Sequence, residues 1–225
     1  MITLVKDTID NKDVDRLIKW LKTYPRLTKG PVTTELEEKY SKWLGTKYSV
    51  FCNSGSSANL LMLYALKQAG YMSNDKVVVP SVAWATDLSP VIQLGMKPIL
   101  CDSNMEDLSV DLDHLEEIFK TTKPSVLLLV SILGLVPNMD KICWLCDKYD
   151  VILLEDACES MGSEYKKQKL GTFGKMSSFS TYFGHHISTI EGGFVSTDDK
   201  KLYEILISIR SHGWDRDLSK DTQTE

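Results

Sequence analysis

The stretch SVLLLVSILGLVPNMDKICWLCDKYDVILLED, residues 125–156, contains two uninterrupted apolar runs separated by an amphipathic segment. Runs without alternating polar residues are typical of strands that are covered on both faces. The segment NMDKICWLCDKYD between them has the apolar spacing of a helix. A strand, a helix and a strand joined by short connections form a unit whose two strands lie parallel. This stretch therefore predicts an α/β fold.

The same alternation continues on both sides of this unit and predicts a mostly parallel, seven-stranded sheet between helices. Two amphipathic helices are expected before it, at 13–25 and 33–45, so we divide the chain into an N-terminal helical segment (1–47) and a large domain (48–225). Ligands of such sheets bind at the carboxyl ends of the strands. Strands are expected at 48–52, 76–80, 97–102, 125–133, 151–156, 177–183 and 193–197, and helices at 56–70, 85–95, 111–122, 138–150 and 200–213.

Composition and charge exclude several classes of protein. The net charge of −5 argues against nucleic-acid binding, which usually requires a basic surface. The longest apolar run, residues 126–136, is well short of the roughly 20 residues of a membrane helix. The N-terminus carries charges where a signal peptide needs its apolar core, so we expect a soluble cytoplasmic protein.

The cysteines do not indicate a disulfide framework, because five is an odd number and they are scattered along the chain. Cys143 and Cys146 form a C-x-x-C pair inside the expected helix at 138–150. No second pair completes a zinc site, so core packing is favoured for both side chains and no metal is expected.

The segment NSGSSANL, residues 53–60, follows the strand at 48–52 and begins a helix. Free backbone N–H groups, the helix dipole and hydroxyl groups at such a place favour a phosphate. Gly55, Ser56 and Ser57 are the candidate donors. Serine is equally an ordinary helix N-cap, so a purely structural role stays open.

Two further strand ends carry candidate residues. Trp84 follows the strand at 76–80, where its indole fits either over a planar cofactor ring or, slightly favoured by position alone, in the core. Asp156 ends the run VILLED, where a buried acid is costly unless it has a partner. Facing a pyridine nitrogen, Asp156 would keep that nitrogen protonated. A helix-capping or solvated carboxylate is the alternative.

The adjacent pair His185 and His186 lies in the segment FSTYFGHHISTIEGG, residues 179–193. Neighbouring side chains diverge in an extended chain, and no nearby carboxylate or cysteine completes a metal site. A hydrogen-bonded structural histidine is one interpretation. A general base is the other, because histidine titrates near neutrality.

These motifs, in this order, resemble the DegT/StrS family of pyridoxal-phosphate (PLP) enzymes, which act on nucleotide-linked keto sugars. The resemblance implies the aspartate-aminotransferase fold (PLP fold type I) with one antiparallel strand. It also implies a small C-terminal domain that these 225 residues do not contain. It is carried by RLTKGPVTTELEEKYSKWLG, FCNSGSSANL, VVVPSVAWATDLSPVIQLGMKPILCD, GLVPNMDKICWLCDKY, ILLEDACESMGSEYKKQKLGTFGKMSSFS and EGGFVST.

The resemblance also implies roles for individual residues. The cofactor phosphate would lie on Gly55, Ser56 and Ser180, and Asp156 would face the pyridine nitrogen. Trp84 occupies the position of the ring that stacks on the cofactor. Glu159 stands where the family's aminotransferases usually carry glutamine, near the ring hydroxyl of the cofactor.

The departure from the aminotransferase pattern is at position 185. Six residues before Glu191, where the family's aminotransferases carry a lysine that binds the cofactor covalently, this chain has His185. Histidine cannot form that bond, so the resemblance implies the dehydratase branch of the family, with His185 as the catalytic base and His186 as a supporting neighbour.

That branch removes the C3 hydroxyl of a nucleotide-linked 4-keto-6-deoxyhexose for dideoxysugar and polysaccharide biosynthesis. It uses pyridoxal 5'-phosphate and pyridoxamine 5'-phosphate, with glutamate as amino donor. The segment RSHGWDRDL, residues 210–218, resembles members that act on GDP-4-keto-6-deoxymannose, and a homodimer is implied. A sugar aminotransferase and a truncated, non-catalytic cofactor-binding relative are the alternatives.

Overall fold

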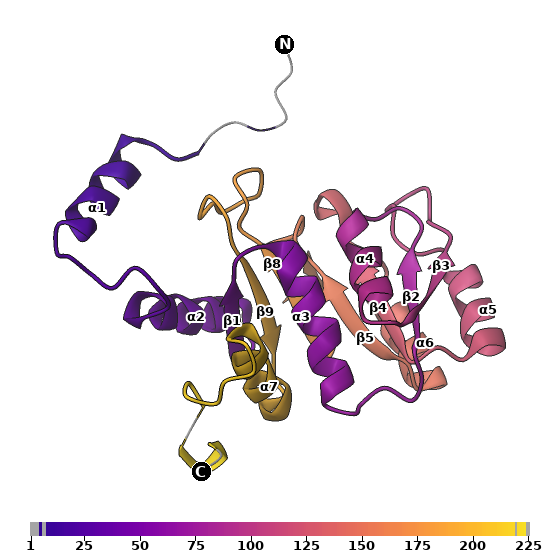
Figure 1. The fold of residues 1–225 in the computed structure, drawn as a ribbon. Coiled ribbons are helices and arrows are strands. Elements are labelled where there is room, and N and C mark those ends of the chain that lie inside the picture. Colours follow the sequence, from indigo (N-terminus) through magenta and orange to yellow (C-terminus); the bar gives the residue numbers. More distant parts are fainter. Residues whose placement is uncertain (1–4, 6–7, 219, 224–225) are drawn as a thin grey trace.

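The computed structural model describes residues 5, 8–218 and 220–223. Its centre is a seven-stranded sheet in the order β1-β9-β8-β5-β4-β2-β3, flanked by helices on both faces (Figure 1). Only β9 runs antiparallel to its neighbours, which are β1 and β8. The expected sheet, with its one antiparallel strand, is therefore confirmed. The strands are β1 Tyr48–Cys52, β2 Lys76–Pro80, β3 Lys97–Cys101, β4 Val126–Val130, β5 Ile152–Asp156, β8 Met176–Ser180 and β9 Gly193–Thr197.

The helices form two layers that bury separate apolar clusters against the sheet. On one face, α3, α4 and α7 pack against side chains such as Val79, Leu154 and Val195. On the other face, α5 and α6 cover Leu127 and Leu153, and α2 packs against the neighbouring strands β8 and β9. The helices are α2 Pro31–Leu44, α3 Gly55–Gln68, α4 Ala85–Gln93, α5 Leu112–Thr122, α6 Met139–Tyr149 and α7 Lys200–Arg210.

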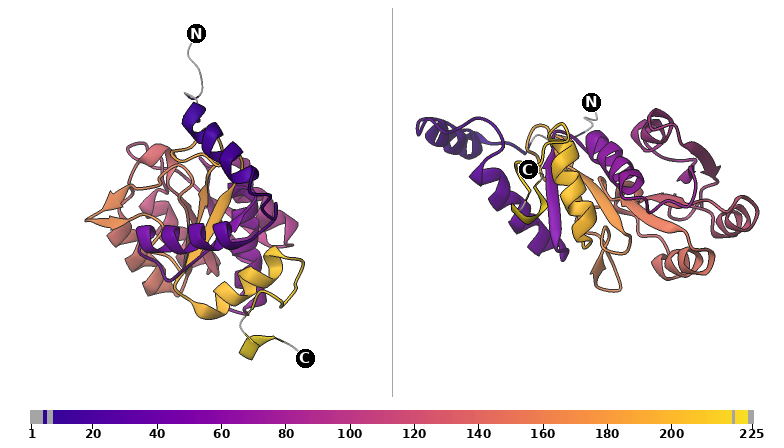
Figure 2. Two further views of the ribbon diagram at one scale, coloured as in Figure 1. Left: turned by 90° about the vertical axis from the view of Figure 1, so that its left-hand side faces the viewer. Right: turned by 60° about the horizontal axis from the view of Figure 1, so that its bottom comes forward.

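Helix α1 (Asn11–Leu21) differs from the other helices because none of its residues is buried. It projects from the body of the molecule beyond α2, as the views in Figures 1 and 2 agree. Asp10 caps its start with a capping box, so local hydrogen bonds rather than packing define the helix.

Three segments differ clearly from the sequence prediction. The strand expected at 125–133 ends at Val130, and a short 3₁₀-helix (η1, Ile132–Gly134) follows it, with Leu133 in the left-handed region at φ 53°. The strand expected at 177–183 ends at Ser180. A small hairpin of β6 (Glu164–Tyr165) and β7 (Gln168–Lys169) was not expected at all.

The cysteine pair lies where the helix prediction placed it. Cys146 of α6 is buried in the core, and Cys143 is partly buried against the same cluster. Core packing is confirmed for both. Among the described residues, no helix combines the length and the apolar character that crossing a bilayer requires.

Candidate active site

The strands β1, β5 and β8 end at the same edge of the sheet, and β9 begins there. Helix α3 starts at this edge directly after β1. Ser54 caps it, and its Oγ accepts the N–H of Ser57 at 3.0 Å. The N–H groups of Gly55 and Ser56 also belong to the first turn, where a helix offers them no acceptor. This turn is suited to an anion because it combines free donors with the positive end of the helix dipole.

Close packing brings two of the predicted phosphate residues into contact. A Cβ atom on Gly55 would lie 2.8 Å from Cβ of Ser180 and 3.0 Å from Sγ of Cys158. A Cβ on Gly193, at the start of β9, would lie 2.5 Å from the carbonyl carbon of Ser54. Only glycine fits at both positions. The first turn of α3 and the end of β8 thus form one small cradle, which fits a phosphate group.

Asp156 is the last residue of β5 and is almost completely buried. Its Oδ2 accepts a hydrogen bond of 2.6 Å from Nδ2 of Asn59, and its Oδ1 accepts the N–H of Cys158 at 2.9 Å. Oδ1 of Asn59 in turn accepts the hydroxyl of Ser178 at 2.5 Å. The capping or solvated alternative for Asp156 is therefore wrong, because the carboxylate lies inside the protein and is held by the side chain of Asn59 on α3 and the backbone N–H of Cys158.

Trp84 is the N-cap of α4 and is 73% exposed. The slight preference for a core position was wrong. The run of apolar residues in β2 ends at Pro80, and Trp84 is not part of the apolar cluster that α4 helps to bury against the sheet. An exposed indole at this edge of the sheet is available for stacking on a planar ring.

Glu159 and His185 approach the same site from two loops. Oε2 of Glu159 accepts the N–H of Leu133 at 2.8 Å. His185 is half-buried in the loop between β8 and β9, whereas His186 is exposed. Burial lowers the pKa of His185. The charge on Glu159 raises this pKa, the neighbouring His186 lowers it, and the charge on Asp156 raises it. The net effect is a lowered pKa, which favours the neutral imidazole at neutral pH.

Sequence reasoning missed three residues that organise the site. Asn59 lies one helical turn after Gly55 on α3, and this spacing of four was a signal for a shared face. Asp87 forms a capping box with the backbone of Trp84, which the motif WATD indicates. Ser178 lies two residues before Ser180 on β8, and so on the same face of the sheet, but nothing in the sequence marks it.

The comparisons with known proteins agree with this architecture. Residues 7–225 match the model of the DegT/DnrJ/EryC1/StrS aminotransferase family. The chain belongs to this family. It is 39% identical over 218 residues to the GDP-4-keto-6-deoxy-D-mannose 3-dehydratase of Yersinia pseudotuberculosis, covering 96% of this chain and 55% of that protein. It is 41% identical over 196 residues to the enzyme of the same name from Escherichia coli O55:H7, covering 86% of this chain and 50% of that protein.

Solved structures show the same fold. A GDP-4-keto-6-deoxymannose-3-dehydratase (ColD) variant with bound GDP-perosamine superposes with a TM-score of 0.92 at 36% identity, covering 100% of this chain and 59% of that one. The Escherichia coli dehydratase with bound hydrated PLP gives a TM-score of 0.91 at 37% identity, covering 98% and 57%. The fold is thus of the PLP type I, aminotransferase-like class. The chain spans 50–59% of the length of these relatives.

Proposed function

We propose that this protein is a PLP-dependent 3-dehydratase that removes the C3 hydroxyl of a nucleotide-linked 4-keto-6-deoxyhexose. The observation that carries the proposal is His185, a half-buried imidazole at the position where the family's aminotransferases carry lysine. Support comes from two relatives at about 40% identity that are named GDP-4-keto-6-deoxy-D-mannose 3-dehydratase. Dehydratases of this name have been solved with bound PLP and with a PLP–glutamate adduct.

The cradle and the buried carboxylate fit pyridoxal 5'-phosphate. Gly55, Ser56 and Ser180 would bind its phosphate, and Trp84 would stack on its ring. Asp156 would accept the ring N–H and hold that nitrogen protonated, because its carboxylate is fixed by Asn59 and by the backbone. When bound, the cofactor supplies an electron sink for breaking bonds next to its imine carbon.

His185 would transfer the proton. Burial favours the neutral imidazole, which is the form that accepts a proton at neutral pH. Because position 185 carries histidine and not lysine, this residue would leave the cofactor bound by non-covalent contacts, with glutamate as the amino donor. Glu159, anchored by the backbone of Leu133, would lie near the ring hydroxyl, and its charge would stabilise the imidazolium once the proton has moved.

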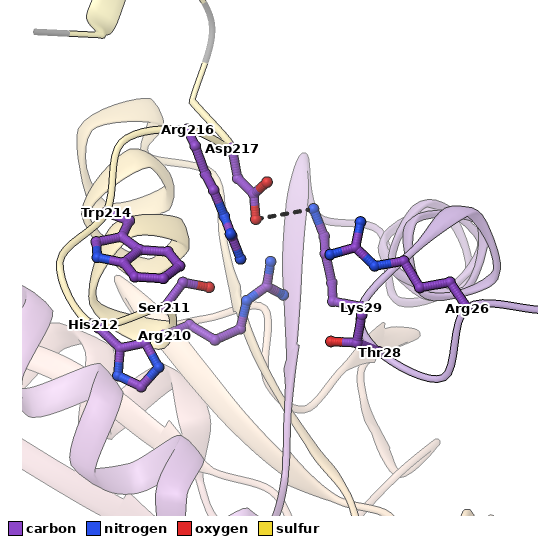
Figure 3. Close-up of a pocket in the computed structure, with 9 residues that line it drawn as sticks. All are labelled: Arg26, Thr28, Lys29, Arg210, Ser211, His212, Trp214, Arg216 and Asp217. Atoms are coloured by element: carbon purple, nitrogen blue, oxygen red, sulfur yellow. Dashed lines mark ion pairs between the residues drawn. The ribbon is translucent and has the colours of Figure 1, made fainter.

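A basic pocket of about 340 Å³ is the candidate site for the nucleotide diphosphate (Figure 3). Arg210, which lines the pocket, is 10% exposed and pairs with Glu37, but its Nη2 is buried with no hydrogen-bond partner among the described residues. Arg210 Nη1 also donates to the carbonyl of Phe51, three residues before the cap of the cradle helix. The pocket is lined by Arg26, Thr28, Lys29, Arg210, Ser211, His212, Trp214, Arg216 and Asp217.

Four cations against one carboxylate make this pocket suitable for a polyanion. Lys29 pairs with Asp217 at 3.4 Å, and the guanidinium of Arg216 lies 4.3 Å from the centre of the Trp214 ring. GDP as the nucleotide, a homodimer and a cytoplasmic location are parts of the same proposal, and the likeness to the GDP-sugar dehydratases supports the first.

Mass spectrometry of the sugar nucleotide tests the proposal. The protein is incubated with PLP, glutamate and GDP-4-keto-6-deoxymannose. We expect a product that has lost the C3 oxygen and retains its ketone, no product from His185→Asn, and product from the neighbouring control His186→Asn. A product that has gained an amino group would instead establish an aminotransferase. Unchanged substrate with the wild-type chain would contradict catalysis by this chain.

A further inference from the structure

A second carboxyl group lies beside Asp156 in the interior. Asp87, in the first turn of α4, is 0% exposed. Nδ2 of Asn59 bridges the two acids, at 3.0 Å from Oδ1 of Asp87 and 2.6 Å from Oδ2 of Asp156. The other oxygen of Asp87 accepts the backbone N–H of Trp84 at 3.1 Å. Asn59 and Asp87 therefore connect Asp156, the candidate residue for the ring nitrogen, with Trp84, the candidate stacking residue.

The ion pairs of the described residues do not include this pair of acids. Burial raises the pKa of Asp87 far above its ordinary value, and the charge of Asp156, which shares the Asn59 donor with it, raises that pKa further. The other titratable groups that face the pair are the thiol of Cys158, whose pKa burial also raises, and His185, whose imidazole interacts with the charge of Asp156. Two adjacent carboxylates in a dry site cannot both be ionised cheaply.

We propose that Asp87 is a positioning residue for the cofactor ring: as a neutral acid it donates its proton to Asp156 and, with Asn59, fixes the orientation of that carboxylate. The inference rests on the proposed function, because it assigns Asp156 to the ring nitrogen. In this arrangement the pair carries a single negative charge, located on Asp156, where it would stabilise a protonated ring nitrogen.

Asp87 also fixes the backbone of the candidate stacking residue, Trp84. The Trp84 N–H donates to Asp87, and the Asp87 N–H donates to the carbonyl of Trp84 at 3.0 Å. The start of α4 is thus fixed to the group that orients Asp156. Loss of the Asp87 carboxyl would loosen two cofactor contacts together, one at the ring edge and one at the ring face.

The test compares Asp87→Asn with Asp87→Ala. An asparagine amide is a neutral donor of nearly the same shape, so it replaces a neutral acid but not a carboxylate. We expect Asp87→Asn to bind pyridoxamine phosphate about as tightly as wild type, and Asp87→Ala to bind it about tenfold more weakly or worse, as for loss of a hydrogen bond to a charged group. Absorption spectra of the bound cofactor across pH provide a second measurement. Asp87→Ala should shift the pH at which the ring nitrogen loses its proton downward.

Asp111 provides the matched control because it also caps a helix, accepting the N–H of His114 at 2.8 Å, but at α5. Asp111→Ala should lower the melting temperature and leave both cofactor measurements unchanged. Equal weakening of cofactor binding by Asp87→Asn and Asp87→Ala would overturn the neutral-acid donor. Normal binding and spectra in Asp87→Ala would overturn the positioning role.

Carbon-13 NMR of aspartate-labelled protein without cofactor separates this inference from the proposed function. A neutral carboxyl signal near pH 7 that disappears in Asp87→Asn is expected, and its absence would overturn the inference by itself. A wild-type chain that shows this signal and takes up neither PLP nor pyridoxamine phosphate would overturn the proposed function, and the positioning role with it.

Discussion

At the scale of the residue, His185 combines a half-buried ring with three charged or titratable neighbours. The charge on Glu159 raises its pKa, so Glu159→Gln should move the acid limb of the kcat/KM profile to lower pH. His186 lowers the pKa, so His186→Asn should move the limb to higher pH. Each shift should be a few tenths of a unit to about one unit, as for single charges near a protein surface. Shifts of opposite sign, measured on the dehydration reaction, would contradict the assignment of this limb to His185.

Gly55 is the second residue whose effect is predictable. A methyl group there would lie too close to Ser180 and Cys158, so Gly55→Ala should lower the free energy of unfolding by about 1–3 kcal/mol, as for overpacking. It should also weaken PLP binding, because the cradle must open to accommodate the new atom. Gly30→Ala, where the nearest atom is 3.5 Å away, is the control and should cost less than about 1 kcal/mol. Denaturant unfolding and PLP titration measure both effects.

Asp87 has a consequence for stability as well as for the cofactor. Its pKa is raised in the folded state, so its contribution to stability is complete below the ordinary aspartate pKa and is lost as pH rises toward the raised value. Between pH 5 and 8 the wild type should therefore lose up to about 1.4 kcal/mol per pH unit relative to Asp87→Asn. Urea unfolding at several pH values measures this slope. Parallel curves for the two proteins would show that Asp87 is ionised when folded.

At the scale of the element, helix α3 connects the cradle with the acid pair. Gly55 begins it, and one turn later Asn59 contacts both Asp87 and Asp156. Asn59→Ala should lower the free energy of unfolding by about 1–3 kcal/mol, because it leaves buried acceptors without a donor. It should also weaken PLP binding, while Ser57→Ala, two residues earlier at a half-buried position, should change stability by less than about 1 kcal/mol. Thermal unfolding and PLP titration of the two variants test this.

The sequence predicted the strands and helices well where apolar runs end at polar or glycine residues. It failed where an apolar run continues beyond the sheet: Ile132 and Leu133 extend the run of β4 but lie in a 3₁₀ turn. It also missed the hairpin of β6 and β7, whose strands have two residues each and whose turn places Lys166 and Lys167 at positive φ without any glycine. Lysines in such a turn give no sequence signal.

The candidate site was predictable only in part. Glycine and serine at a helix start, and an acid after a buried strand, can be recognised as candidate site residues from the sequence, because these residue types are needed at such places for few other reasons. The sequence indicates only that Asn59 shares a helix face with Gly55 and that Asp87 can form a capping box. Their contact with each other depends on which helices lie side by side at the end of the sheet. Trp84 shows the same limit, because an indole near a strand end is compatible with both core and surface. The roles of all these residues, and the division of the chain at residue 47, stay predictions.

At the scale of the whole molecule, the basic pocket joins the segment after α1 to the segment after α7. Arg216→Ala should raise KM for the nucleotide sugar by about tenfold and leave PLP affinity unchanged, because loss of one charged contact costs roughly 1.5–3 kcal/mol. Its effect should shrink as salt is added. Lys22→Ala, an exposed cation outside the pocket, is the control. Steady-state kinetics at two ionic strengths would show whether the pocket holds the diphosphate.

The antiparallel strand β9 determines how the loop that carries His185 is attached to the sheet. Because β9 returns between β1 and β8, the loop carrying His185 is anchored at both ends in central strands and adds no element to the core. The groups proposed to hold the cofactor lie on strands and helix starts, whereas the group proposed to move the proton lies on this loop. Under the proposed function, cofactor retention and reaction outcome would therefore be separable by mutation. Exchange of one loop side chain would redirect the chemistry while the sheet, its helices and the phosphate cradle stay unchanged.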